Sequence, residues 1–455
     1  MHVCQRWRQL IFTSPRRLNL QLLCTPKTPA RKNLDCWPRV SIAIKARLSL
    51  ANQNPTQEAN LLTAFERSDR VCSITINVLT RQQLEMVFKI MLRLFPALTH
   101  LRLLFSTEFE MFSLPTVPSG FLGGPSSRLR ELNLSGLSPP ALPSILPSTG
   151  DLVDLCLCNL PMTDVVSPEA MVTGLAVMTK LESLTIEFRF NPTYPLPAQN
   201  FRARAIFPTL TQFRFRGHHK YLECLVAQLD TPRLFELNVI IPIPCLFTNF
   251  QNFPQLFQFI DRAEDLKLSL RRAHAEFHNF HSFIHFDSAQ TRQRPTSLTL
   301  GDSPHSFGKS GPLVMRELLS QASTIIPSMR HLSITRVDKK WNSKTYWDRH
   351  AGLLQLFRLF DTVETLHVGG HFTDLLPPML KKLSNELVAE VLPALHLLNL
   401  ECTTRKFLKK KKQLAPFIEK RQIMGRPPLI IVRKREDFER LQALTEICEM
   451  EGGHS

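Results

Sequence analysis

The sequence predicts an α/β solenoid, in which short parallel strands and short helices alternate along most of the 455 residues. Two observations carry this prediction. An apolar-x-x-apolar-x-apolar pattern recurs from near residue 70 to residue 400, and the segments between its copies show apolar residues at helical spacing. A third observation agrees with both, because a chain that is 43% apolar is rich enough to bury a large shared core.

The strand pattern explains the burial of each repeat. Its last two apolar residues are two positions apart, so they point to the same side of a short strand, while the first turns the chain into that strand. Intervals between copies run from 23 to 34 residues, near and somewhat above the roughly 20 to 29 residues of a leucine-rich repeat. Twelve copies begin at Val71, Leu98, Leu129, Leu152, Leu181, Leu210, Leu234, Ala263, Pro295, Met329, Val363 and Leu395.

Stacked repeats of this kind predict a leucine-rich-repeat horseshoe with a parallel sheet on its concave side. Helical spacing at Arg81 to Phe95 and at Pro312 to Ala322 predicts helices on the convex side. The 33 prolines interrupt long helices, so we expect these convex elements to be short and uneven.

The repeats divide the chain into four predicted regions. Residues 1–22 form a helix and its exit, residues 23–70 a linker with a first irregular unit, residues 71–402 the repeats, and residues 403–455 a basic closing segment.

Strand residues beside the buried positions point to the concave face, and most of them are polar with both signs of charge. Such a surface suits recognition of a protein partner better than burial of a small cofactor, although a merely solvated face is the alternative. The candidate partner-binding residues are His100, Arg102, Glu131, Asn133, Asp154, Thr185, Glu187, Arg214, Arg216, Glu236, Asn238, Lys267, His331, His367 and Asn399.

The formal charge of +17 is concentrated at the two ends of the chain. Residues 1 to 34 contribute +7 and residues 403 to 442 contribute +9. A nucleic-acid-binding protein spreads basic residues over its binding face, so we do not expect nucleic acid as a partner. The basic run that begins at Arg405 is interpreted as a solvated loop, with nuclear import or an anionic membrane as alternatives.

Cysteine usage predicts a reducing compartment. The ten cysteines include no C-x-x-C pair and follow no secretory signal, so they are interpreted as small buried apolar residues of a cytoplasmic or nuclear protein. No apolar stretch approaches the roughly 20 residues of a membrane-spanning helix, so we expect no membrane insertion.

The first residues carry an amphipathic helix. Val3, Trp7, Leu10 and Ile11 fall on one helical face, and Pro15 ends the helix. The segment Val3-Cys-Gln-Arg-Trp-Arg-Gln-Leu-Ile-Phe-Thr-Ser-Pro-Arg-Arg-Leu-Asn-Leu resembles the last helix and exit of an F-box, the module that docks on the Skp adaptor of cullin-type ubiquitin ligases.

With the irregular repeats and the closing Arg421-Gln-Ile-Met-Gly-Arg-Pro-Pro, the chain resembles the F-box/leucine-rich-repeat-like proteins of mushroom-forming fungi. The resemblance implies that the F-box recruits a Skp adaptor through Val3, Trp7, Leu10 and Ile11, and that the repeats select the protein to be ubiquitinated. The first half of an F-box has no counterpart here, so a stand-alone scaffold that recruits no ligase is the alternative. A mitochondrial transit peptide is a second interpretation of residues 1 to 34, which contain no acid.

Two motifs mimic chemical sites. Gly308-Lys309-Ser310 lacks the glycine that a phosphate-binding loop has five residues earlier. His274, His278, His281 and His285 would share one face if residues 273–286 were helical, but a hairpin is equally consistent with the sequence. Because neither H-E-x-x-H nor G-x-S-x-G occurs, we expect no enzyme, no catalytic residues, no cofactor and no metal.

Overall fold

The computed structural model divides the chain into two compact units, Met1–Arg233 and Leu234–Ser455, and each is treated by itself. The structure describes residues 20–48, 55–105, 116–118, 120–123, 128–137, 150–160, 166–189, 204–242, 253–277, 282–287, 297–303, 311–322, 324–336 and 346–432.

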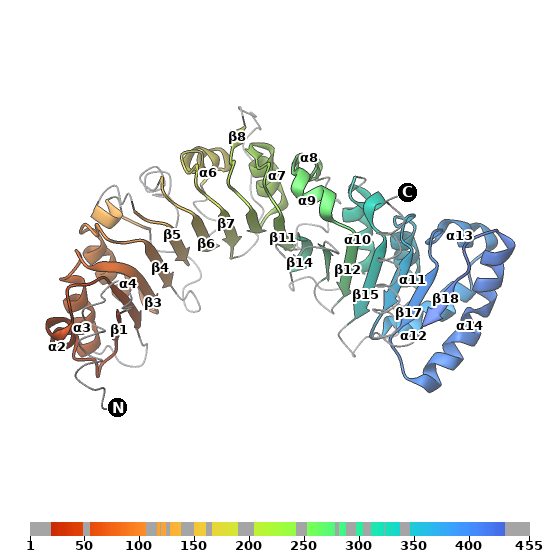
Figure 1. Ribbon diagram of the computed structural model, residues 1–455, viewed down its shortest axis with the longest axis horizontal. Coiled ribbons are helices and arrows are strands. Elements are labelled where there is room, and N and C mark those ends of the chain that lie inside the picture. Colours follow the sequence, from red (N-terminus) through yellow and green to blue (C-terminus); the bar gives the residue numbers. More distant parts are fainter. Residues whose placement is uncertain are drawn as a thin grey trace, which may run out of the picture. The chain divides into compact units, whose positions relative to one another are not determined.

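The first unit contains a parallel sheet whose strands follow the order of the chain (Figure 1). Neighbouring strands pair in parallel from one end of this unit to the other. The strands are β1 (Leu20–Cys24), β2 (Ile42–Arg47), β3 (Val71–Val78), β4 (His100–Phe105), β5 (Glu131–Ser135), β6 (Asp154–Leu160), β7 (Ser183–Phe188) and β9 (Gln212–Arg216).

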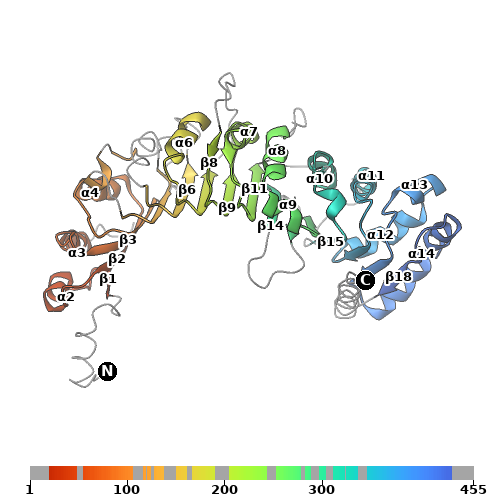
Figure 2. The same ribbon diagram turned by 45° about the horizontal axis from the view of Figure 1, so that its top comes forward.

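Helices connect these strands and lie along one side of the row (Figure 2). They are α2 (Ala30–Cys36), α3 (Pro55–Phe65), α4 (Arg81–Met91), α6 (Pro168–Leu175) and α7 (His219–Ala227), with a 3-10 turn η2 (Phe121–Gly123) beside α4. A separate parallel pair, β8 (Ala205–Ile206) and β10 (Leu229–Asp230), flanks α7.

The predicted repeat pattern sets the register of this sheet. Leu101, Leu132, Leu155, Leu184 and Phe213 occupy equivalent positions on successive strands, and all five are buried. Because each strand starts at the same level as its neighbour, the apolar residues form continuous rows instead of isolated contacts.

Backbone hydrogen bonds at the strand entrances repeat in the same way. The carbonyl oxygen of Thr99 accepts from the amides of Arg130 and Glu131 at 2.8 and 3.0 Å. The carbonyl of Arg130 accepts from Val153 and Asp154 at 2.8 and 2.9 Å. Both lone pairs of each carbonyl are therefore used, which fixes how every repeat turns into its strand.

The second unit contains a similar sheet with one reversed strand. Its strand order is β11 (Glu236–Pro242), β14 (Ser297–Ser303), β13 (Ser282–Asp287), β12 (Arg272–Phe277), β15 (His331–Arg336), β16 (Thr365–Val368), β17 (Leu397–Leu400) and β18 (Ile430–Val432). All described pairs are parallel except those of β13, which is antiparallel to β12 and β14.

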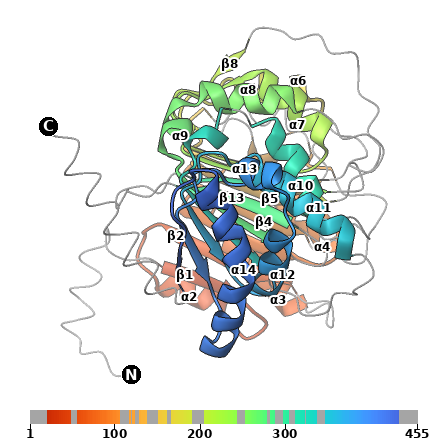
Figure 3. The same cartoon turned by 90° about the vertical axis from the view of Figure 1, so that its right-hand side faces the viewer.

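The helices of the second unit vary in length. They are α8 (Pro254–Arg262), α9 (Glu264–Ser269), α10 (Gly311–Ser320), α11 (Tyr346–Phe357), α12 (Phe372–Lys381), α13 (Asn385–Glu390) and α14 (Thr404–Ile423), with a 3-10 turn η5 (Ile326–Ser328). Prolines do not set the ends of these helices, because Pro377 and Pro378 lie inside α12 and Pro416 lies inside the 20-residue α14. Figure 3 shows α12 and α14 side by side, and α14 also contacts α13.

One predicted strand is wrong. The repeat copy at Ala263 forms helix α9, so Lys267 lies on a helix and not on a strand of the sheet. Glu264 and Asp265 occupy the first helical turn, where acidic side chains favour a helix N-terminus. The next segment then supplies the β12–β13 hairpin, which agrees with the hairpin alternative for residues 273–286.

Strands also occur before residue 71, where the predicted repeats begin. Strand β1 spans the boundary between the predicted regions 1–22 and 23–70, and β2 lies in the region 23–70, for which the sequence predicts a linker with a first irregular unit. Residues 1–19 lie outside the described part of the chain. In the closing segment, β18 pairs in parallel with β17 and so continues the sheet of the second unit.

The basic run at Arg405 is helical and not a loop, because α14 packs against the second unit through one face. Lys410 is buried beside Asp374 at 2.8 Å. Arg421 is 1% exposed and donates to the carbonyls of Leu392, Pro393 and Leu395 at 3.0, 3.2 and 2.7 Å. The exposed face retains Arg405, Lys406, Lys409, Lys411 and Lys412.

No helix among the described residues is long and apolar enough to cross a membrane.

Candidate functional site

Two rows of polar side chains cross the sheet of the first unit. One row consists of His100, Glu131, Asp154, Ser183 and Gln212 on β4, β5, β6, β7 and β9. The second row lies two residues further along each strand and consists of Arg102, Asn133, Cys156, Thr185 and Arg214. We call these ten residues the polar sheet face.

The sequence predicted most of this face. Strand alternation places His100, Arg102, Glu131, Asn133 and Asp154 together across β4, β5 and β6. On β7 and β9 it also brings together Thr185 with Arg214, and Glu187 with Arg216. These nine predicted residues therefore share one surface of the first unit.

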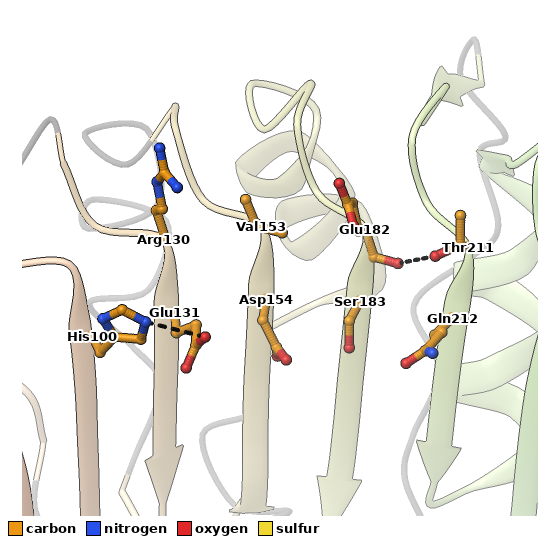
Figure 4. Close-up of a pocket in the computed structure, with 9 residues that line it drawn as sticks. All are labelled: His100, Arg130, Glu131, Val153, Asp154, Glu182, Ser183, Thr211 and Gln212. Carbon is orange, nitrogen blue, oxygen red and sulfur yellow. Dashed lines mark hydrogen bonds and ion pairs between the residues drawn. The ribbon is translucent and has the colours of Figure 1, made fainter. Parts of the chain in front are cut away.

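A pocket of about 380 Å³ lies where the strands of this face begin (Figure 4). Its lining includes three acidic residues, Glu131, Asp154 and Glu182, and the cationic Arg130. The side chains of Glu131 and Asp154 point along their strands, whereas those of Arg130 and Glu182 point the opposite way (Figure 4). Ser183 and Gln212, which open β7 and β9, stand at positions that strand alternation places on this face. Sequence reasoning missed the lining residues that directly precede a strand, which are Arg130, Val153, Glu182 and Thr211.

The position of these missed residues follows from the repeat. Each directly precedes a strand, and the shared entrance hydrogen bonds bring the entrances of four successive repeats to one level. Thr211 illustrates this geometry, because its Oγ1 donates to the carbonyl of Glu182 at 3.0 Å (Figure 4). Counting one residue back from each predicted strand would have found them.

The His100 side chain contacts Glu131 on the neighbouring strand and Thr99 at the start of its own strand. Its Nε2 lies 3.2 Å from Glu131 Oε1, and its Nδ1 lies 2.7 Å from Thr99 Oγ1. Both side chains are about half exposed, so this pair contributes little to folding stability and remains accessible to a partner.

Asp154 is the least solvated carboxylate of the pocket. Burial raises the pKa of Asp154 above its usual value, the negative charge of Glu131 adds to this effect, and Arg214 opposes it. A cationic side chain from a partner would relieve the repulsion between Asp154 and Glu131. The pocket therefore favours a positively charged group.

The second unit holds the other predicted face residues, and there the result is mixed. Glu236 and Asn238 lie on β11, and His331 and His367 lie on β15 and β16. Asn399 is 0% exposed, so it cannot contact a partner directly. Its Nδ2 lies 2.9 Å from His367 Nδ1 and orients that ring.

Two histidines that the sequence considered for a metal lie opposite each other in this sheet. His274 on β12 pairs in register with His285 on β13. His285 Nδ1 lies 2.9 Å from Thr299 Oγ1, and His274 Nε2 lies 2.9 Å from Glu276 Oε1. His278 and His281 lie outside the described residues, as does Gly308-Lys309-Ser310.

Within the described part of the chain, no group of three or more His, Cys, Asp or Glu side chains is placed so that it could hold a metal ion. Cys24 and Cys224 are buried, as predicted for small apolar residues. The other described cysteines differ from that prediction, because Cys36 is exposed and Cys72, Cys156, Cys158 and Cys402 are partly exposed. On β6, the Sγ atoms of Cys156 and Cys158 are 3.3 Å apart.

Comparisons with known proteins find matches among solved structures but none by sequence. No family model matches the chain. No curated relative matches it either. Among solved structures, a leucine-rich-repeat protein of Leptospira interrogans aligns at 11% identity over 93% of this chain and 98% of that chain, with a TM-score of 0.25.

Proposed function

We propose that this chain is a protein-interaction module that binds a protein partner through the polar sheet face of the first unit. The observation that carries the proposal is the pair of in-register polar rows with both signs of charge, of which the first row lines a pocket together with Arg130 and Glu182. Such a surface offers charge complementarity over several strands.

The shape of the surface favours a macromolecule over a small ligand. Small-molecule sites are concave and mostly apolar, with few polar groups. Here the pocket is lined mainly by charged and polar side chains, and exposed Arg102 and Arg214 extend the polar surface across the sheet. A partner that places a Lys or Arg in the pocket and acidic groups near Arg102 would match both charges.

The proposal is tested by reversing charge on this face. We expect Arg102→Glu with Arg214→Glu to weaken binding of the natural partner at least tenfold, because two favourable charge contacts become repulsive. Partners are identified by affinity purification of the full chain from its own cells, and each affinity is measured with purified components. Lys89→Glu, a charge reversal at an exposed position of α4 away from this face, is the control.

Equal partner recovery by the Arg102/Arg214 double variant and the wild type would refute the assignment of this face.

A more specific role as substrate-recognition subunit of an SCF-type ubiquitin ligase is supported by the resemblance of the first residues to an F-box. Under this proposal Val3, Trp7, Leu10 and Ile11 bind a Skp adaptor. Trp7→Ala with Leu10→Ala should abolish adaptor co-purification and leave the partner of the sheet face bound. If the wild-type chain recovers no adaptor, the alternative of a stand-alone scaffold replaces this role.

We further propose that the chain has no catalytic activity of its own and works in the cytoplasm or nucleus. The support is the sequence, which carries neither a hydrolase motif nor a complete phosphate-binding loop. Measurable nucleotide binding at millimolar ATP would contradict the first statement, and localisation to mitochondria would contradict the second.

A further inference from the structure

Strand β6 presents two thiols side by side on the sheet surface of the first unit. Cys156 and Cys158 are alternate residues of one strand, so their side chains leave the sheet on the same side. Their Sγ atoms are 3.3 Å apart, and both residues are partly exposed. A single ion that reaches one sulfur can therefore reach the other.

The strand favours chelation over a disulfide. Alternate Cα atoms of an extended strand are about 6.6 Å apart, at the upper end of the roughly 4.4 to 6.8 Å seen across disulfides. Two sulfurs bound linearly to one metal ion are about 4.6 Å apart if each bond is about 2.3 Å long. Side-chain rotation at Cys156 and Cys158 reaches that separation without moving the backbone.

Local electrostatics make Cys156 the first ligand. A hydrogen bond from the Cys158 thiol lowers the pKa of Cys156, and the same contact, followed by burial, raises the pKa of Cys158. The thiolate is the form that binds metals. Asp154 and Glu187 lend a negative potential that attracts a cation, and Arg102 partly offsets the charge left by two bound thiolates.

We propose that Cys156 and Cys158 form a two-sulfur binding site for a soft monovalent metal ion, with Cu⁺ as the test ion. Soft thiolate ligands select Cu⁺ over harder cations, and two sulfurs suffice for its coordination. On binding, each thiol releases one proton to solvent and forms one sulfur–copper bond, so neither copper nor sulfur changes oxidation state. This site does not depend on the proposed protein partner.

The test is a thiol footprint on the full reduced chain without oxygen. Cu⁺ is delivered from a chromophoric chelator at one equivalent, cysteines are then alkylated, and each site is quantified by mass spectrometry. We expect alkylation of Cys156 and Cys158 to fall at least tenfold, while exposed Cys36 reacts as before. Cys156→Ser should restore alkylation of Cys158, whereas Cys36→Ser should leave the protection intact.

Three results would overturn the site. Equal alkylation of Cys156 and Cys158 with and without Cu⁺ excludes binding there. Protection before Cu⁺ is added that disappears after a further round of reduction indicates a disulfide instead. Protection of Cys158 that survives in Cys156→Ser excludes a shared ion. Circular dichroism checks the fold of each variant, and the wild-type footprint decides the question even if a serine variant unfolds.

Discussion

At the scale of single residues, the buried histidines at the start of α7 tie stability to pH. Burial lowers the pKa of His218 to about 4 and that of His219 to about 3, with Lys220 contributing to both. An unfolded histidine titrates near pH 6.5. Below that pH the unfolded chain therefore binds more protons than the folded chain. The stability that comes from keeping these two histidines neutral is complete above pH 6.5 and is lost as the pH falls.

We predict a loss of about 2 kcal/mol per histidine in the free energy of unfolding between about pH 7.5 and pH 5. Urea unfolding at both pH values measures it. His218→Asn should remove about half of the effect, because asparagine also caps a helix N-terminus but does not titrate. The same pH dependence in His218→Asn and in the wild type would contradict this origin.

Arg421 is the second residue whose chemistry is decided by burial. Its guanidinium donates to three carbonyls between α13 and β17, and burial, with a smaller effect of Arg426, lowers the pKa of Arg421 to about 10. The side chain therefore stays charged at neutral pH. One side chain of α14 therefore supplies hydrogen-bond donors to three backbone carbonyls in the turn between α13 and β17.

Arg421→Met should cost on the order of 3 to 5 kcal/mol, because three buried carbonyls lose a charged donor. Arg421→Lys keeps the charge but not the fork of donors, so its loss should be smaller. Thermal unfolding ranks the two variants. A Met variant as stable as the wild type would show that water replaces the guanidinium.

At the scale of elements, α4 shows how a helix that connects two strands is started by its own sequence. Thr80 Oγ1 accepts from the Gln83 amide at 3.3 Å, and Gln83 Oε1 accepts from the amide of Thr80 at 3.3 Å. This reciprocal capping box satisfies amides that the first helical turn leaves without partners.

Thr80→Ala should reduce the free energy of unfolding by about 1 kcal/mol, since the cap oxygen is lost. Thr80→Ser keeps that oxygen and should remain close to the wild type. Denaturant midpoints measured under identical conditions distinguish the variants, and equal losses in both would point to the missing methyl group instead.

At the scale of the whole molecule, each repeat contacts mainly its neighbours in the sheet. Leu132 on β5 pairs with Leu101 on β4 and with Leu155 on β6, and it is 1% exposed. Stability in such an array is the sum of local repeat terms and nearest-neighbour interfaces. A substitution in the core of one repeat should therefore destabilise that repeat and its two neighbours more than distant repeats.

Leu132→Ala should cost about 2 to 5 kcal/mol locally. Hydrogen exchange should accelerate in β4, β5 and β6 and remain unchanged in β1 and β2. Uniform acceleration through β1 and β2 would show that the first unit opens as one cooperative block.

The repeat pattern was sufficient for eleven of the twelve predicted strands, because burial at three fixed positions is a local property of each repeat. It failed at Ala263, because the apolar residues that match the pattern there lie in and next to helix α9, which begins with Glu264 and Asp265. Strands β1, β2, β12, β13 and β18 lie outside its twelve copies, although a first irregular unit was predicted within residues 23–70 and a hairpin was an alternative for residues 273–286.

Alternation along a strand also predicted which side chains leave the sheet, so nine residues of the candidate surface followed from the sequence alone. Three features required tertiary structure. The pocket forms where four repeats begin at one level, the Asn399 side chain is buried against His367, and the Sγ atoms of Cys156 and Cys158 meet at 3.3 Å. The sequence determines periodicity and the side of each strand, since both are local, whereas pocket shape, burial of polar groups and thiol separation depend on how neighbouring repeats align and pack.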